Sequence, residues 1–398
     1  MRIAPDTFRF TALIGFLAAM PALSIDISAP TLVALQADFG TTATVAGLTL
    51  SMFMVGFAFG QAGGGALSDR HGRRPLLLSG LLAYAAAAAG CALSPSAAAL
   101  VAFRFVQGLG AGTCAVLAFA VVEDLFEGDA ARSKRSYVTV VFGLTPVLAP
   151  ALGAMLSDLA GWRSVHAVLA AAGLALLAAV WWGVPESRPA RASRPASQPA
   201  FNEPAALWRD GRFVGLAAVN ALSYGCVFAY IAGSPLVVIG LMGLSTAAYA
   251  ALFASTALAL TAGAWISGRL SRRGVGADAM VGPSLTLSAI AAASLFALSF
   301  PVPLPAALLI PLLLATLFCR GVIAPNVQHL AVQRRRDRVG TASAVVGVSQ
   351  ILAGALASAA VALLLPSLGQ AAVAGCMAVL ALGAAAGWRW AVRSRPGL

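Results

Sequence analysis

The chain has 398 residues, of which 60% are hydrophobic and only 10% are charged. An ordinary soluble domain has about 25% charged residues, so this composition excludes a water-soluble fold. The net charge of +12 resembles that of a nucleic-acid binder, but the basic residues stand in short clusters between apolar runs, which is typical of membrane topology.

Apolar runs long enough to cross a bilayer recur along the whole chain. About 20 apolar residues form one span, so twelve spans and their short loops fit this length. We therefore predict an all-α integral membrane protein with twelve transmembrane helices in two pseudo-symmetric six-helix halves. The predicted spans are residues 10–34, 44–66, 76–93, 97–122, 137–157, 164–184, 213–239, 246–268, 279–299, 303–330, 340–365 and 371–391.

A stretch rich in Pro, Ser, Ala and Arg follows the sixth span. Residues 185–212 have no apolar helical period, so they are predicted to form a cytoplasmic linker. The linker joins an N-terminal six-helix half, residues 1–184, to a C-terminal half, residues 213–398. The first apolar run is longer than that of a signal peptide, so we expect it to be retained, with cleavage as the alternative.

The distribution of basic residues predicts the orientation, because cytoplasmic loops carry an excess of Lys and Arg. With the N-terminus inside, 23 of the 26 basic residues fall on the cytoplasmic side. Arg163 falls on the outer side, and Arg104 and Arg320 fall within spans. Both termini are therefore predicted to be cytoplasmic, and the positive charge needs no nucleic acid.

Three charged residues lie well inside spans, where a charge costs several kcal/mol unless it meets a partner or water. Asp26 is interpreted either as a proton-carrying carboxylate or as a hydrated residue at the outer mouth of the first span. Arg104 either favours the ionised form of a nearby acid, contacts substrate, or donates hydrogen bonds to backbone carbonyls. Arg320 has the same alternatives and no obvious acidic partner in its own half.

Glycines repeat every four residues on the second predicted span, at Gly56, Gly60 and Gly64. Such a repeat removes side chains from one face of a helix and lets a neighbouring backbone approach closely. We predict a helix-packing groove on this face.

The loop after the second span reads Gly65-Ala-Leu-Ser-Asp69-Arg70-His71-Gly72-Arg73-Arg74. This pattern, G-x-x-x-D-R-x-G-R-R between two spans, resembles the cytoplasmic loop signature of the major facilitator superfamily. The loop after the eighth span, Gly268 to Arg273, repeats the basic residues without the acid, as expected of a duplicated six-helix unit. Arg104 and Arg320 are predicted to occupy similar places in the two halves, as a second trace of this repeat.

Three further segments resemble the drug:proton antiporters of the bicyclomycin and chloramphenicol resistance (Bcr/CflA) type. They are Ser24-Ile-Asp26-Ile-Ser-Ala-Pro30, Arg104-Phe-Val-Gln107-Gly108, and Thr145-Pro146-Val-Leu-Ala-Pro150-Ala-Leu-Gly153. The last is similar to a motif associated in this superfamily with export. One departure is Glu123-Asp124 at the inner end of the fourth span, where members of the group often have Arg-Asp.

The resemblance implies roles for particular residues. Asp26 and Arg104 are expected to couple transport to protons. A conformational latch is expected from Asp69, Arg70, Arg73 and Asp124, with the N-terminus of the eleventh span as another partner for Asp69. Pro146, Pro150 and Gly153 are expected to form a bent seam between the halves. Candidates for the wall of the substrate cavity are Met54, Phe57, Gln107, Asn220, Tyr224, Phe228 and Tyr230, with Gln350 as a further polar point.

The function predicted on this basis is proton-coupled export of small lipophilic drugs by alternating access, from a bacterial inner membrane and by a monomer. The alternatives are a proton-coupled importer or exporter of a small metabolite and, less in keeping with the motifs, a receptor that transports nothing. The chain has three widely separated histidines, five cysteines without CxxC spacing and no GxxxxGK[ST] loop. We therefore expect no enzyme activity, no cofactor and no metal.

Overall fold

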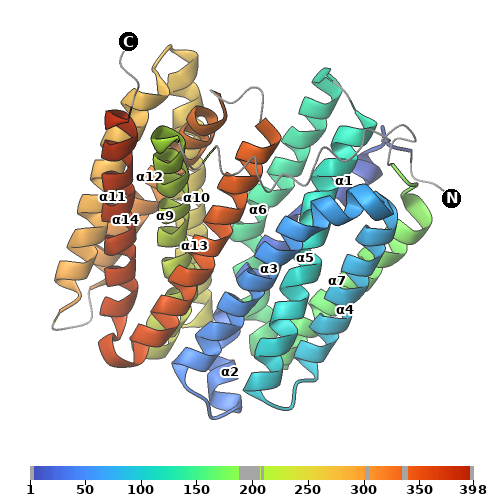
Figure 1. Cartoon of the computed structure of the whole chain (residues 1–398). Coiled ribbons are helices and arrows are strands. Elements are labelled where there is room, and N and C mark those ends of the chain that lie inside the picture. The colour runs from blue at the N-terminus through green and yellow to red at the C-terminus, as the bar shows by residue number, and fades with distance from the viewer. Residues whose placement is uncertain are drawn as a thin grey trace. The chain divides into compact units, whose positions relative to one another are not determined.

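The computed structural model describes residues 4–126, 128–187, 207, 210–300, 305–333 and 339–394 (Figure 1). These residues form helices and turns, with no β-strand among them. Within this described part of the chain, twelve helical segments are long and apolar enough to cross a membrane. The protein is therefore an all-helical, multi-pass membrane protein, as predicted.

The chain divides into two compact units, Met1–Pro195 and Ala196–Leu398, each with six candidate spans. Most of the predicted linker lies outside the described residues. The helices of the first unit are α1 (Phe8–Asp26), η1 (Ala29–Thr31), α2 (Leu32–Asp38), α3 (Ala43–His71), α4 (Arg73–Ala92), α5 (Ala97–Leu125), α6 (Gly128–Ala160) and α7 (Trp162–Gly183). Those of the second unit are α9 (Gly211–Pro235), η2 (Leu236–Leu241), α10 (Thr246–Arg272), α11 (Ala277–Leu298), α12 (Ala306–Gln333), α13 (Val339–Leu368) and α14 (Gln370–Arg393).

The first span is broken into three pieces, α1, η1 and α2. The α1 helix ends at Asp26, a short 3-10 turn follows, and α2 completes the crossing. Pro30 explains the break, because proline has no N–H to donate to the carbonyl of Asp26 and its ring crowds the preceding turn. The sequence therefore places Asp26 at the end of a helix rather than in the middle of one.

Glycines hold α3 and α5 in close contact. Gly56 and Gly60 of α3 lie against the backbone carbonyls of Phe105 and Leu109, so that a Cβ at either glycine would overlap them. Gly108 of α5 lies in the same way against the carbonyl of Phe53. The predicted packing groove on the second span is confirmed, and its partner is α5.

The equivalent crossing in the second unit corrects the predicted repeat of the two buried arginines. Gly321 of α12 lies against the carbonyl of Leu260 in α10, as Gly108 lies against α3. Arg320 directly precedes its crossing glycine, whereas Arg104 lies four residues before Gly108. The prediction that these arginines occupy similar places is wrong, because they differ by about one helical turn or more in register.

Candidate functional site

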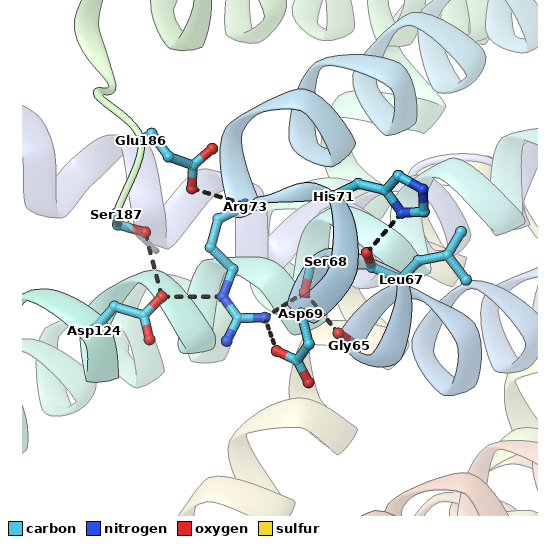
Figure 2. Close-up of polar contacts among 9 residues, drawn as sticks. All are labelled: Gly65, Leu67, Ser68, Asp69, His71, Arg73, Asp124, Glu186 and Ser187. Atoms are coloured by element: carbon cyan, nitrogen blue, oxygen red, sulfur yellow. Dashed lines mark hydrogen bonds and ion pairs between the residues drawn. The ribbon is translucent and has the colours of Figure 1, made fainter. Parts of the chain in front are cut away.

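Arg73, the first residue of α4, lies between two carboxylates at the α3–α4 loop (Figure 2). Its Nη1 is 2.7 Å from Oδ1 of Asp69, at the end of α3, and its Nε is 3.0 Å from Oδ2 of Asp124, at the end of α5. Nη1 also donates a hydrogen bond to the hydroxyl of Ser68. One guanidinium thus connects the ends of three helices.

The two ion pairs of Arg73 differ in their exposure to solvent. The side chain of Asp69 is 66% exposed, whereas those of Asp124 and Arg73 are 13% and 15% exposed. An exposed pair contributes at most about 1 kcal/mol, because water and salt screen it. We therefore assign the Arg73–Asp124 pair the larger structural role. Arg70, the fourth residue predicted for the latch, is exposed on the last turn of α3.

Glu186, which lies outside the predicted motifs, contacts the α3–α4 loop from the segment after α7. Its Oε1 accepts a hydrogen bond from the backbone N–H of Arg73 at 2.9 Å, and its Oε2 accepts one from that of Arg74 at 3.2 Å. A carboxylate at a helix N-terminus satisfies free N–H groups and interacts favourably with the helix dipole. Glu186 therefore caps α4 from the segment that follows α7 (Figure 2).

Gly72 fits this arrangement for two reasons. Its φ of +97° lies in the region that favours glycine. A Cβ on Gly72 would also lie 2.6 Å from Oε2 of Glu186.

Ser187, the residue that follows Glu186, contacts the shielded carboxylate of the loop. Its hydroxyl donates a hydrogen bond to Oδ2 of Asp124 at 3.3 Å. We call Asp69, Arg73, Asp124, Glu186 and Ser187 the loop cluster.

Asp26 is 4% exposed and lies at the break in the first span. Among the described residues, its carboxylate has no hydrogen-bond or ion-pair partner on another side chain. An ionised carboxylate buried in this way is unfavourable unless water or a counterion reaches it. This environment is that of a group able to carry a proton.

Arg104 of α5 is 1% exposed and donates to the first span, but not to Asp26. Its guanidinium hydrogen-bonds the carbonyls of Ser24 and Thr49 at 3.4 Å and the hydroxyl of Ser28 at 3.3 Å. Ser24 precedes Asp26 by two residues, or about 200° around a helix, so their two side chains lie on different faces of α1. The contacts of Arg104 match the alternative of a hydrogen-bonding post for backbone carbonyls, and its part in proton coupling remains a prediction.

A buried polar cluster surrounds Arg104. Gln107 accepts from Nη1 at 2.9 Å, Tyr84 shares a hydrogen bond of 2.7 Å with Ser24, and the ring centroid of Phe53 lies 4.4 Å from the guanidinium carbon. Gln107, a candidate for the wall of the substrate cavity, is fully buried, and its side-chain carbonyl accepts the hydrogen bond from Arg104. The cluster joins α1, α3, α4 and α5.

The predicted export motif lies on α6, where Pro146 and Pro150 fall inside the helix. Gly153 lies against the backbone of Ile27, the residue after Asp26, and a Cβ at this position would overlap the Ile27 carbonyl. This close approach is within the first unit. The predicted seam between the halves remains a prediction, as does the contact of Asp69 with the eleventh span.

In the second unit, Arg320 of α12 contacts neutral groups on α9. Its Nη1 donates to Oδ1 of Asn220 at 3.3 Å and to the hydroxyl of Ser223 at 3.1 Å, and its guanidinium lies 5.7 Å from the ring of Tyr224. Asn220 in turn donates to Gln350 of α13 at 2.9 Å. Arg320 therefore connects α12 to α9, and Asn220 extends the connection to α13.

The remaining candidates for the substrate wall are aromatic or sulfur-containing. Tyr224 and Phe228 have ring centroids 4.7 Å apart, and Tyr230 stacks on Phe253 at 5.9 Å. Met54 is fully buried, and Phe57 packs against Gly112 of α5. Contact of any of these residues with substrate remains a prediction.

The described residues contain no group of three or more His, Cys, Asp or Glu side chains that could hold a metal ion.

A second charged cluster lies on the predicted outer side. Asp38 accepts hydrogen bonds from Trp162, at 3.1 Å, and from Arg163, with which it forms an ion pair. Arg163 also donates to the carbonyl of Ser94 at 3.4 Å. This second charged cluster was not predicted, and it ties the start of α7 to the end of α2 and to the α4–α5 turn.

Twelve candidate spans in two six-helix units, with a charged cluster at the α3–α4 loop, are typical of a membrane transporter. The sequence profile of the Major Facilitator Superfamily matches residues 12–358. The chain belongs to this superfamily of transporters.

Two relatives are similar to this chain over most of its length. The "Uncharacterized MFS-type transporter YdgK" of Bacillus subtilis (strain 168) is 29% identical over 87% of this chain and 86% of its own. The "Bicyclomycin resistance protein homolog" of Haemophilus influenzae (strain ATCC 51907 / DSM 11121 / KW20 / Rd) is 26% identical over 90% and 89%. The crystal structure of a bacterial homologue of the human lysosomal transporter Spinster has a TM-score of 0.76 over 98% of both chains, at 16% identity, which shows a common fold.

Proposed function

We propose that this protein exports small lipophilic drugs in exchange for protons, by alternating access, as a monomer in the inner membrane of a bacterium with both termini in the cytoplasm. The name of the Haemophilus influenzae relative supports export of an antibiotic-like compound. The few charges within the spans support a lipophilic rather than a charged substrate.

Asp26 carries the proposal of proton coupling. Its carboxylate is buried, has no described side-chain partner, and lies at a break in the first span. Protonation removes the cost of its charge, and ionisation requires water to reach it, so its two states favour different degrees of hydration of this region. A group of this kind couples proton binding to a change between inward-open and outward-open states.

The loop cluster is proposed to act as the latch that stabilises one of these states. Arg73 and Asp124 form its shielded pair, and Glu186 fixes the start of α4 beside them. Separation of Asp69 from Arg73 costs little free energy because this ion pair is exposed. The cluster can therefore lose the Asp69 pair and keep the Asp124 pair.

The experiment compares Asp26→Asn with the wild type in proteoliposomes under an imposed pH gradient, with export of a fluorescent lipophilic dye as the readout. We expect Asp26→Asn to insert and to bind dye but to lose the dependence of export on the gradient. The matched control is Asp158→Asn, which removes an exposed carboxylate of α6 and should keep that dependence. Full coupling in Asp26→Asn would exclude Asp26 as the proton carrier.

A further inference from the structure

The helices α4 and α7 pack against each other in the first unit (Figure 1). A surface groove runs between them, beyond the loop cluster. Its volume is about 440 Å³. Its walls include Leu78, Ser79 and Leu82 of α4, and Leu174, Trp181 and Trp182 of α7. Leu82, Leu174 and both tryptophans are exposed. In a membrane-spanning chain such an apolar surface faces the acyl chains of lipids.

A cationic side chain lies at one end of this groove. Arg74, Leu78 and Leu82 are spaced by four residues, so they share one face of α4, with Arg74 nearest to the start of the helix. The Nη2 of Arg74 donates to the backbone carbonyl of Trp181 at 2.6 Å, and its guanidinium lies 5.8 Å from the Trp181 ring. The guanidinium therefore lies beside the last turn of α7, at the end of the apolar walls.

The dimensions of the groove match one leaflet of a bilayer. From Arg74 to Leu82 the α4 helix rises by about 12 Å, compared with about 15 Å for the hydrocarbon half-thickness. Tryptophans such as Trp181 and Trp182 are typical of the level of the lipid headgroups. A lipid whose headgroup lies at Arg74 would therefore extend one acyl chain along the groove.

We propose that this groove is a binding site for an anionic phospholipid, with one acyl chain between α4 and α7 and the phosphate at Arg74. The planar guanidinium matches the geometry of a phosphate group and forms strong hydrogen bonds with it. Near Arg74, the carboxylate of Glu186 is engaged by the backbone N–H groups of Arg73 and Arg74. The proposal depends only on membrane insertion and is independent of what the protein transports.

Native mass spectrometry of the delipidated, detergent-purified full chain tests this site. The probes are dioleoylphosphatidylglycerol, which is anionic, and dioleoylphosphatidylethanolamine, which is zwitterionic. We expect one phosphatidylglycerol to bind at least tenfold more tightly than phosphatidylethanolamine, and Arg74→Gln to weaken its binding roughly tenfold. The matched control is Arg269→Gln on α10, which removes a guanidinium 4.9 Å from the ring of Trp265 and should leave this affinity unchanged.

A second variant tests the groove without changing its charge. Ser79→Trp, at an exposed position, fills the groove and should abolish tight binding of phosphatidylglycerol even though Arg74 is present. If Arg74→Gln fails to fold, Ser79→Trp decides the result alone. Equal affinity of the wild type for the two lipids, or wild-type affinity in Ser79→Trp, would overturn the proposal.

Discussion

Gly153 of α6 lies against the backbone carbonyl of Ile27, the residue that follows Asp26 at the break in the first span. The predicted export motif and the candidate proton carrier are therefore in adjacent positions of the same unit. Any side chain at Gly153 would displace the segment that holds Asp26, because the nearest neighbour is backbone and does not yield as a flexible side chain does.

We accordingly expect Gly153→Ala to impair transport and to destabilise the protein by about 1–3 kcal/mol, the usual cost of overpacking. Gly143→Ala is the matched control, because Gly143 lies on the same helix and a Cβ there would meet no other segment within 4 Å. Thermal melting of the two variants in detergent, together with dye export, gives the comparison. Equal melting temperatures and equal rates of dye export in the two variants would show that transport does not depend on the close contact with Ile27.

The unequal exposure of the two carboxylates in the loop cluster predicts unequal effects of their removal. Asp124→Asn should slow transport more than Asp69→Asn, because Asp124 is the shielded partner of Arg73 and also accepts from Ser187. We expect Asp69→Asn to lower stability by no more than about 1 kcal/mol. Transport rates and melting temperatures measured side by side check this order, and the reverse order would assign the latch to Asp69.

Gly72 and Glu186 should be energetically coupled. Gly72→Ala introduces a methyl group against the carboxylate of Glu186 and also strains a positive φ, so we expect a loss of about 1–2 kcal/mol. In the double variant with Glu186→Ala the contact with the carboxylate is gone and only the backbone strain remains. A double-mutant cycle on melting free energies should therefore be non-additive, and simple additivity would contradict a contact between these residues.

Arg104 should be sensitive even to a conservative change. Lysine keeps the charge but has three N–H groups on one nitrogen, whereas the three guanidinium nitrogens donate to four acceptors, on Ser24, Ser28, Thr49 and Gln107. We expect Arg104→Lys to destabilise the first unit, while Arg269→Lys, on an exposed turn of α10, has little effect. Limited proteolysis of the detergent-solubilised variants would report the difference.

The twelve spans were predictable because each needs only a run of apolar residues of the right length, which is a local property. The meeting of Asp69, Arg73 and Asp124 was expected from a motif whose residues lie close together at the ends of helices. Glu186 was missed because it contacts α4 across 113 residues of sequence and follows the sixth span in a segment with the composition of a linker. Composition gave no indication that this particular carboxylate returns to the bundle.

The direction of a side chain was harder to predict than its depth. Both Asp26 and Arg104 were expected within spans, and the side chains of both are buried within the first unit. Their mutual orientation depends on the helical phase of the first span and on its break at Pro30, which a hydropathy pattern does not report. The register of Arg320 was misjudged for a similar reason, because the glycine crossing of α10 and α12 is a contact between distant segments.

The hydrogen bonds from Arg104 to the carbonyl of Ser24 have a consequence for biogenesis. A lone arginine opposes the transfer of an inserting helix into lipid by up to about 3 kcal/mol on translocon scales, and Arg104 lies seven residues into α5. The acceptors that relieve this cost belong to the first span, which is synthesised about eighty residues earlier. We therefore expect α5 to integrate more readily when α1 is still beside the translocation channel as α5 emerges.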